Sequence, residues 1–307
     1  MLLDVYRQRI EKGNPENLWS EAGLKSLTPL ARQQGKDAYL FDLLTRGAIS
    51  KPESVATIFG VETKIPPKEL HPVHPDPEVH TQNGLHAALA VDRTLREAGY
   101  SFQSKGSVLD FGAGAGRVVR FLAPAYPNID WHACDVVENL VAWGEQHLSA
   151  IRFSLNPVYP PSQYKTDQFD TIFAVSVFSH LTEEHALLWL KELHRILKPG
   201  GYLLITVLGK YNVDLRRDPE KLGGKHGMND VDFDKVANDL EQHGFVYVDA
   251  CKRSRILHPI LADPPYGAAF MLPKWIEMND LNGRYEITLF KERALSAQDG
   301  IVLRKRA

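Results

Sequence analysis

From about residue 100 onward, apolar runs typical of strands alternate with apolar positions at helical spacing, which predicts alternating strands and helices. Short apolar runs predict strands at 107–111, 129–133, 151–155, 169–176 and 202–208. Apolar residues at helical spacing predict helices over about 117–126, 137–148 and 182–197. Strands that alternate with helices are typical of a doubly wound α/β fold with a mostly parallel sheet.

The regions on either side of this core have a different character. Residues 20–60 carry helical periodicity, and the proline-rich stretch 64–78 predicts an extended connector before a helix at about 82–98. After Gly209 the pattern loosens until a helix at 232–243 and a strand at 245–250. A short helix near 273–279 and two closing strands, at about 285–291 and 300–306, predict a terminal hairpin. We therefore expect a helical extension over 1–80 and a main domain over 81–307, with an insertion over 209–280.

The composition and charge of the chain indicate which classes of binding partner to expect. The chain has 307 residues, 44% of them hydrophobic, and 36 basic against 38 acidic side chains, so it lacks the bias that favours nucleic acid or an anionic membrane. No apolar run approaches the roughly 20 residues that a membrane span needs, and the N-terminus lacks the layout of a secretion signal. We expect a cytoplasmic protein with a small-molecule partner, no nucleic acid and no membrane; a homodimer stays open.

The segment VLDFGAGAGR at 108–117 carries the strongest chemical signal. A strand ends at Asp110, and Gly112 and Gly114 then allow a turn in which the backbone lies against a ligand at the start of a helix. Asp135 ends the second strand, where its carboxylate is suited to the two hydroxyls of a ribose. The spacing is GxGxG rather than GxGxxG, and it suits NAD and S-adenosylmethionine alike. The pattern predicts a nucleoside-like cofactor.

Four blocks in one order decide between these cofactors: VLDFGAGAGR, HACDVVENL, FDTIFAVSVFSHL and LHRILKPGGYLLITVLG. Between about 107 and 209 the chain resembles the class I S-adenosylmethionine-dependent methyltransferases of the bacterial small-molecule group. The resemblance implies a Rossmann-like methyltransferase fold with a seven-stranded, mostly parallel sheet. It also implies S-adenosylmethionine as cofactor and S-adenosylhomocysteine as product, with residues 1–80 as a lid and 209–280 on the substrate side.

The resemblance also implies a set of cofactor contacts. The implied cofactor-binding residues are Asp110, Gly112, Ala113, Gly114, Asp135, Val136, Asn156, Ser176, Val177 and Phe178. The glycine turn would lie beside the methionine part, Asp135 would bind the ribose diol, and Val136 and Asn156 would meet the adenine. The three residues after the fourth strand would flank the transferred methyl group. Structural alternatives stay open: a turn-forming role for Asp110 and Asn156, and core packing for Phe178.

His180 is the candidate general base, because it follows the fourth strand and its pKa lies near neutrality. A hydroxyl acceptor needs such a base more than an amine does. The alternative is a structural histidine that bonds a neighbouring loop. His71, His74, Asp76 and His80 raise the possibility of a metal site, but prolines make this segment an extended connector, and we expect no metal.

The predicted activity is methyl transfer to oxygen or nitrogen of a small molecule such as a metabolite, a sugar or a natural-product intermediate. Two alternatives are an NAD-dependent oxidoreductase and a protein that binds S-adenosylmethionine without methyl transfer. Basic residues between 210 and 225 form either a solvated loop or a contact for an acidic acceptor.

Overall fold

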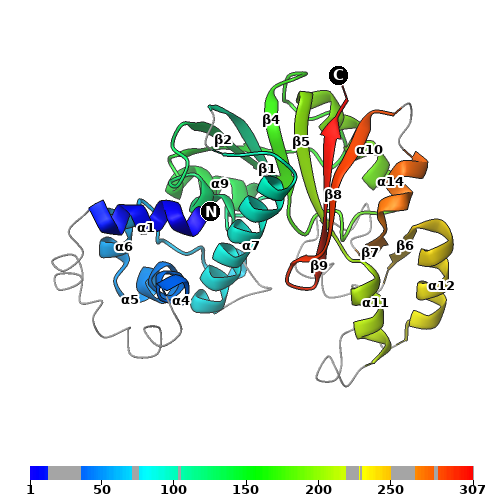
Figure 1. The fold of residues 1–307 in the computed structure, drawn as a ribbon, viewed down its shortest axis with the longest axis horizontal. Coiled ribbons are helices and arrows are strands. Elements are labelled where there is room, and N and C mark those ends of the chain that lie inside the picture. The colour runs from blue at the N-terminus through cyan, green and yellow to red at the C-terminus, as the bar shows by residue number, and fades with distance from the viewer. Residues whose placement is uncertain are drawn as a thin grey trace. The chain divides into compact units, whose positions relative to one another are not determined.

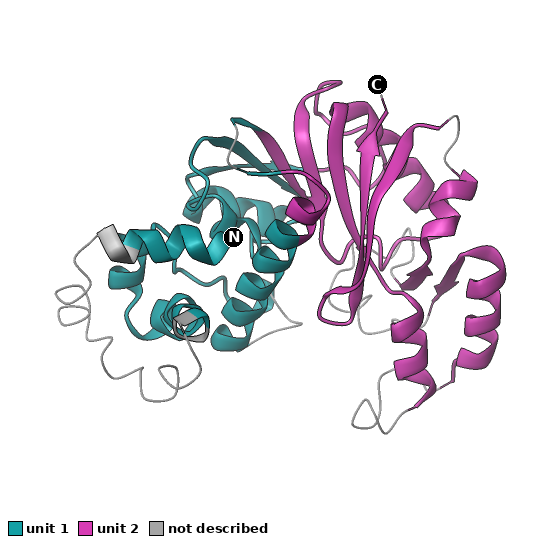
Figure 2. Ribbon diagram, viewed as in Figure 1, with its two compact units in different colours: residues 1–93, 101–106, 113–155 teal, residues 94–100, 107–112, 156–307 magenta. Residues whose placement is uncertain are grey.

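A computed structural model describes residues 1–12, 36–70, 76–102, 105–218, 228, 230–249, 267–279 and 283–306. Contacts divide the chain into two compact units (Figure 2). Unit 1 holds residues 1–93, 101–106 and 113–155, and unit 2 holds 94–100, 107–112 and 156–307. The chain passes from unit 2 to unit 1 within the glycine turn, between Gly112 and Ala113.

A seven-stranded sheet has the hydrogen-bonded order β3-β2-β1-β4-β5-β9-β8 (Figure 1). Its strands are β1 (Gly106–Phe111), β2 (Ile129–Asp135), β3 (Ile151–Leu155), β4 (Phe169–Ala174), β5 (Leu197–Val207), β8 (Tyr285–Leu295) and β9 (Gln298–Lys305). The pairs β2–β3, β1–β4 and β4–β5 are parallel, whereas β9 is antiparallel to β5 and to β8. The predicted seven-stranded, mostly parallel α/β fold and its terminal hairpin are confirmed.

Helices connect these strands and fill both units. They are α1 (Leu2–Lys12), α4 (Lys36–Asp42), α5 (Ala48–Ser50), α6 (Pro52–Phe59), α7 (Pro77–Glu97), α8 (Val119–Leu122), α9 (Glu138–His147), α10 (Glu183–Ile196), α11 (Lys210–Arg217), α12 (Phe233–His243) and α14 (Pro273–Asn279), with a π-helix at Leu43–Gly47 and a 3-10 turn at Lys68–Leu70. Thr182 caps α10 by accepting a hydrogen bond from the His185 N–H, and two glutamates follow it in the first turn. No described helix is both long and apolar enough to span a lipid bilayer.

The amino-terminal helix α1 packs on the core of unit 1 through a buried acid. Asp92 of α7, which is 2% exposed, accepts hydrogen bonds from the Leu2 N–H at 3.0 Å and the Tyr126 hydroxyl at 2.7 Å. Tyr6 donates its hydroxyl proton to the Phe121 carbonyl at 2.5 Å. The first turn of α1 is therefore satisfied by a side chain from outside the helix, which fixes it on α7.

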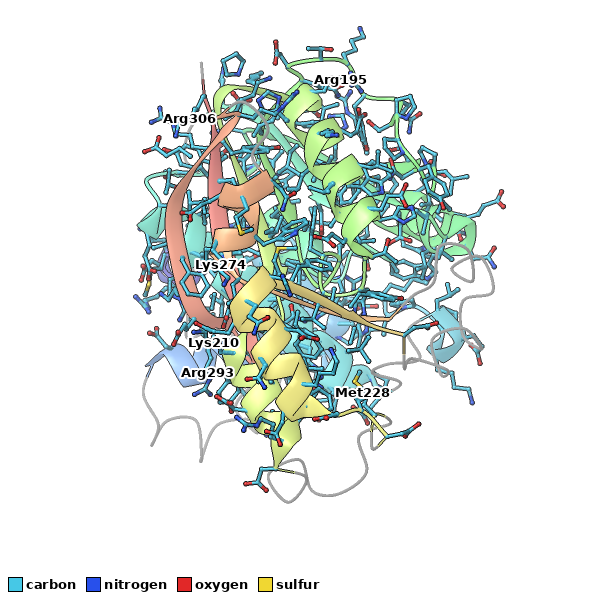
Figure 3. The ribbon with its side chains drawn as sticks, turned by 90° about the vertical axis from the view of Figure 1, so that its right-hand side faces the viewer. Arg195, Lys210, Met228, Lys274, Arg293 and Arg306 are labelled. Atoms are coloured by element: carbon cyan, nitrogen blue, oxygen red, sulfur yellow. The ribbon has the colours of Figure 1, made fainter. Side chains whose placement is uncertain are left out.

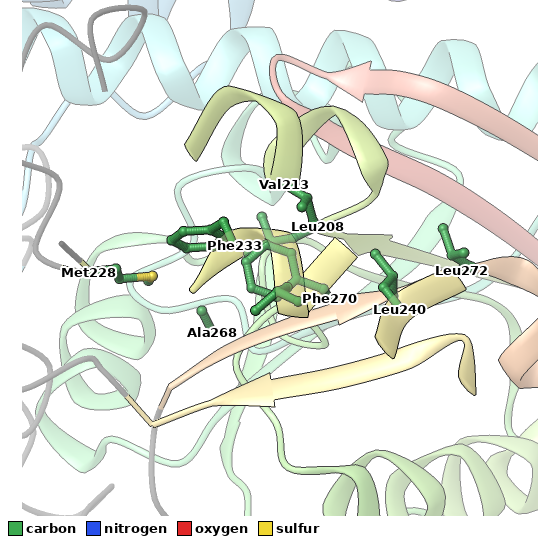
Figure 4. Close-up of a cluster of buried hydrophobic side chains, with 9 residues drawn as sticks. Leu208, Val213, Met228, Phe233, Leu240, Ala268, Phe270 and Leu272 are labelled. Carbon is green, nitrogen blue, oxygen red and sulfur yellow. The ribbon is translucent and has the colours of Figure 1, made fainter. Parts of the chain in front are cut away.

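The described residues between 208 and 272 (208–218, 228, 230–249 and 267–272) form a small cap in unit 2 with its own apolar cluster (Figure 4). The strand predicted at 245–250 is β6 (Phe245–Val248), which pairs with β7 (Ala268–Met271) in a separate two-stranded sheet. Neither β7 nor α11 was expected. The polar sequence of α11 resembles a loop, but its Val213 is 2% exposed and packs in the same cluster as Phe233 and Phe270. Burial of Val213 in the cap's apolar cluster thus stabilises a helix that the polar sequence of α11 does not predict.

The predicted helix at 117–126 is shorter than expected. Only Val119–Leu122 is α-helical, and turns precede and follow it. A Cβ on Gly84 of α7 would lie 2.5 Å from the Arg117 carbonyl oxygen, so this backbone segment approaches α7 closely. The close approach accounts for the departure from regular helix at its start.

Candidate functional site

The glycine turn after β1 takes conformations that side chains disfavour. Gly112 has φ +75° and Gly114 has φ +58°. A Cβ on Gly112 would lie 2.3 Å from Val177 Cγ2, whereas one on Gly114 would meet nothing nearer than Leu140 Cδ1 at 4.0 Å. Gly112 is therefore needed for packing against the segment after β4, and Gly114 keeps open space beside its backbone. Such open backbone suits the close approach of a ligand.

Asp135 lies at the end of β2 and is tied to the same turn. Its Oδ2 accepts a hydrogen bond from the Gly114 N–H at 2.8 Å, and its Oδ1 accepts one from the Val137 N–H at 3.0 Å. The Ala113 N–H donates to the Cys134 carbonyl at 2.9 Å, so two bonds join the turn to this strand end. Val136 is half-buried in the bend that follows.

The remaining predicted contacts surround the ends of β1 and β4 in unit 2. Asp110 is 1% exposed and pairs in register with Phe173 of β4. Val177 contacts the glycine turn at Gly112, as given above. Phe178 is fully buried, which favours the core-packing alternative that the sequence left open; its predicted cofactor contact stays a prediction.

A polar network that the sequence analysis missed holds Ser176. Ser176 has φ +60°, which is left-handed backbone. Its N–H donates to Thr206 Oγ1 at 2.7 Å, and its hydroxyl donates to Gln298 Oε1 at 3.1 Å. Thr206 Oγ1 also donates to Gln298 Oε1, at 2.6 Å. The network joins the segment after β4 to β5 and to the first residue of β9. Thr206 stands in the block LHRILKPGGYLLITVLG, but Gln298 has no local sequence signature.

His180 has a defined tautomer. Its Nδ1 lies 2.8 Å from the Gly267 carbonyl oxygen, and because a carbonyl only accepts, Nδ1 carries the proton and Nε2 does not in the neutral ring. Burial lowers the pKa of His180, although the bond to Gly267 opposes the shift. The ring is therefore neutral at pH 7. This bond matches the structural role considered for His180 and leaves its catalytic role a prediction.

Asn156 follows β3 and carries an unsatisfied buried atom. The residue is 4% exposed, and among the described residues its Oδ1 has no hydrogen-bond partner. A buried amide oxygen without a donor costs free energy, so such positions call for a ligand or water. An N–H donor is the group that it requires.

A buried acid lies beside the same hairpin turn as Gln298. Asp299 is 2% exposed and accepts the Arg293 N–H at 2.8 Å. Burial raises the pKa of Asp299 above its usual range, and this bond opposes the shift only in part. A Cβ on Gly209 would lie 1.8 Å from Asp299 Oδ2, so only glycine fits at the end of β5.

Two described basic residues of α11, Lys210 and Arg217, are paired with acids, whereas Arg216 donates to the Asn212 side chain and lies over the Phe270 ring. Lys210 bonds Glu241 of α12 at 2.8 Å, and Arg217 contacts Asp214 at 3.5 Å and Asp234 at 2.5 Å. Figure 3 looks onto α12 with Lys210 and Lys274 labelled next to it. Lys221 and Lys225 lie outside the described residues. The part of this cluster that the structure describes is a solvated ion-pair surface rather than an open cationic patch.

The candidate metal residues are only partly described. His71 and His74 lie outside the described residues. His80 is buried on α7, and the described parts of the chain contain no group of three or more His, Cys, Asp or Glu side chains arranged to hold a metal.

The predicted site residues thus fall into two groups. In unit 1 the structure brings together Ala113, Gly114, Asp135 and Val136 at the end of β2. In unit 2 it brings together Gly112, Val177 and the neighbouring Ser176, with Asp110 at the end of the adjacent strand β1. Asn156 and His180 belong to unit 2 as well.

Comparison with known proteins gives a match over the sheet core. A family model described as "Methyltransferase domain" matches residues 109–203. Phosphoethanolamine N-methyltransferase 2 of Caenorhabditis elegans is 28% identical over 116 residues, which are 36% of this chain and 25% of that protein. A tRNA N(3)-methylcytidine methyltransferase of Schizosaccharomyces pombe is 27% identical over 108 residues, which are 32% of this chain and 42% of that protein. The matches span less than half the length of these two relatives.

Among solved structures, an S-adenosylmethionine-dependent methyltransferase from Aquifex aeolicus aligns with 79% of this chain and all of its own. The sequence identity is 17% and the TM-score is 0.46.

Proposed function

We propose that this chain, whose residues 109–203 match a family model described as "Methyltransferase domain", is a class I S-adenosylmethionine-dependent methyltransferase that transfers a methyl group to oxygen or nitrogen of a small-molecule acceptor. The domain match supports the methyltransferase activity, and the sequence blocks that imply this activity also imply S-adenosylmethionine as the methyl donor. The acceptor class is the part of the proposal that goes beyond this match.

One observation carries the proposal: the positive-φ glycine turn and Asp135 are bonded to each other at the end of β2. A turn with exposed backbone next to a carboxylate suits a ligand that has a ribose diol and a cationic amino acid part. The space beside the Gly114 backbone is open, and the Asp135 carboxylate lies next to it. The residues present therefore fit S-adenosylmethionine as the methyl donor. Asn156 adds a buried acceptor atom of the kind that an adenine amino group satisfies.

The roles of the chain's own residues follow from methyl-transfer chemistry. Bound S-adenosylmethionine supplies a methyl group already activated by the positive sulfonium. The protein's task is to hold acceptor and methyl group in line, and positioning accounts for most of the acceleration in such reactions. Asp135 would bind the ribose, and the turn at Gly112 and Gly114 would support the methionine part. Within unit 2, Ser176 and Val177 are the predicted neighbours of the transferred methyl group.

His180 is the residue that we propose as proton acceptor for a hydroxyl substrate. Its protonated Nδ1 is held by the Gly267 carbonyl, so Nε2 is the basic nitrogen. The lowered pKa keeps the ring neutral at physiological pH, which a base requires. A neutral amine attacks the methyl group before it loses a proton, whereas a hydroxyl is a weak nucleophile until its proton is removed. Replacement of His180 by glutamine should therefore reduce the rate far less with an amine acceptor than with an alcohol.

Support for a small-molecule acceptor comes from charge. The chain has 36 basic against 38 acidic residues, and of the α11 cations Lys210 and Arg217 are engaged by acids while Arg216 is engaged by Asn212 and the Phe270 ring. A nucleic-acid enzyme needs unpaired cations for phosphates. The relatives named above include one enzyme whose name gives a phosphorylated amine and one whose name gives a tRNA base. The second makes RNA the competing acceptor to test.

The first experiment is calorimetric titration of the purified chain with S-adenosylhomocysteine, S-adenosylmethionine and NADH. We expect dissociation constants for the two sulfur nucleosides at or below about 1 mM, the upper end of usual enzyme affinities, and none for NADH. Asp135→Ala should weaken binding, and Asp130→Ala, on the same strand but exposed in surface ion pairs, is the matched control. NADH binding without binding of the sulfur nucleosides would instead support an oxidoreductase.

The second experiment identifies the acceptor class. Transfer of a radiolabelled methyl group from S-adenosylmethionine is measured to panels of alcohols, amines and phosphorylated amines, and to bulk tRNA. Label in a small-molecule panel, abolished by Asp135→Ala, is the expected result. Label in tRNA alone would contradict the small-molecule proposal. Donor binding with no transfer to any panel would favour a binding protein.

A further inference from the structure

We propose that Gln298 is a positioning residue for the methyl donor, acting through Ser176. The inference rests on the proposed function, because it concerns the donor side of that site. Gln298 is the first residue of β9, and it lies 122 positions after Ser176 in the chain. Its side-chain oxygen accepts both the Ser176 hydroxyl and the Thr206 hydroxyl.

The antiparallel register explains why this residue reaches the donor edge. Val207, the last residue of β5, pairs with Asp299, so the turn between β8 and β9 lies at the carboxyl end of the neighbouring parallel strand. Ligands of doubly wound folds bind at this edge. Asn212 Nδ2 donates to the Ala297 carbonyl within the same turn, which fixes it on α11. The turn that carries Gln298 is therefore fixed in place by this hydrogen bond.

Ser176 needs this support because its backbone is left-handed. A non-glycine residue at φ +60° carries a conformational cost that persists only where neighbours stabilise it. Thr206 Oγ1 accepts the Ser176 N–H, and its own proton goes to Gln298 Oε1. Gln298 therefore orients the hydroxyl that accepts the backbone N–H and also binds the Ser176 side chain.

The position of Ser176 matters for the glycine turn one residue later. Val177 is the residue that a Cβ on Gly112 would strike, at 2.3 Å. If Ser176 left its conformation, Val177 would move against or away from Gly112. Gln298 thereby sets the shape of the turn on which the donor is expected to lie, without touching the donor.

The test uses Gln298→Met, which keeps length and removes the acceptor oxygen. We expect the dissociation constant for S-adenosylhomocysteine and the KM for S-adenosylmethionine to rise together by about tenfold, the effect of losing about one net hydrogen bond. At saturating donor, kcat should stay within about twofold, because the reacting groups are unchanged. The matched control is Gln242→Met, an exposed glutamine on α12 whose side chain has no such role. Should Gln298→Met not fold, Gln298→Asn replaces it, since the shorter amide cannot reach both hydroxyls.

Rescue distinguishes positioning from general stability. Glycine takes positive φ without cost, so Gln298→Met should weaken donor affinity much less in a Ser176→Gly background than in the wild-type background. Wild-type affinity in Gln298→Met, or equal weakening by Gln298→Met in the two backgrounds, would overturn the inference while the proposed function stands. Failure of the wild-type chain to bind either sulfur nucleoside would overturn the proposed function and this inference with it.

Discussion

Asp135 and Ser176 both follow parallel strands at their carboxyl ends, but different parts of the protein hold them. The two oxygens of Asp135 accept backbone N–H groups of Gly114 and Val137, 21 and 2 residues away. Ser176 is held by the side chains of Thr206 and Gln298, 30 and 122 residues away. The backbone-held group depends on a turn that only glycine forms easily, and the side-chain-held group depends on particular hydroxyl and amide atoms.

The largest expected effect comes from replacing Gly112, the glycine that packs against Val177, the residue after Ser176. Gly112→Ala introduces a Cβ 2.3 Å from Val177 Cγ2 at φ +75°. Positive φ costs about 1–2 kcal/mol and overpacking about 1–3 kcal/mol more. Gly114→Ala should carry only the first cost, since its Cβ meets nothing closer than 4.0 Å. Denaturant unfolding of both variants measures the difference, and equal destabilisation would show that the clash is relieved locally.

The next largest effect should come from Thr206→Val, which keeps shape and removes the hydroxyl. The Ser176 N–H loses its acceptor and Gln298 loses one donor, so the free energy of unfolding should fall by about 1–3 kcal/mol. Thr288→Val on β8 is the control, because its hydroxyl donates to the Val302 carbonyl and supports no other group. If the two variants lose equal stability, the side-chain network is no more than an ordinary set of hydrogen bonds.

A smaller effect is expected when the backbone-held group changes chemistry. Asp135→Asn retains one acceptor oxygen but cannot accept both backbone N–H groups. Affinity for S-adenosylhomocysteine should fall about tenfold, equivalent to about 1.4 kcal/mol. Asp130→Asn on the same strand should leave affinity unchanged, since surface ion pairs contribute little. Calorimetric titration of both variants with S-adenosylhomocysteine measures the two affinities. An unchanged affinity in Asp135→Asn would show that Asp135 has no role in cofactor binding.

The smallest effect is a change of slope with pH. Burial raises the pKa of Asp299 above its ordinary value of 3.8, so between that value and its raised pKa the folded state binds more protons than the unfolded state. Stability due to this group therefore falls as pH rises through that window. Asp299→Asn keeps an acceptor for the Arg293 N–H and should flatten the stability curve just above pH 3.8. Urea unfolding at a series of pH values measures this dependence of the unfolding free energy on pH. Equal slopes in the variant and the wild type would show that Asp299 does not contribute to it.

The same contrast explains what the sequence could predict. The doubly wound, mostly parallel core followed from apolar runs, and the number of seven strands followed from the family resemblance. Local signals predicted α14 (Pro273–Asn279) and the Thr182 cap of α10. The glycine turn and Asp135 also lie within one local motif. Their contacts are made by backbone groups whose identity does not depend on distant residues.

Gln298, Thr206 and β7 were missed because their roles arise from pairing across long distances. A glutamine after a polar turn has no distinguishing local pattern, and only the register of β9 against β5 brings it to Ser176. Likewise α11 has one buried valine among polar residues, and it forms a helix because the cap's apolar cluster accepts that valine. Tertiary contacts, rather than local sequence, determine the structure at these positions.

The order of the last three strands of the sheet sets a condition on how the protein is made. β8 precedes β9 in the chain, yet its hydrogen-bonded neighbour in the sheet is β9, which lies between β8 and β5. On the ribosome, β8 cannot join the sheet until β9 has emerged. Until then the free edge of β5 is open to other strands, and a chaperone that shields this edge should raise the yield of native protein.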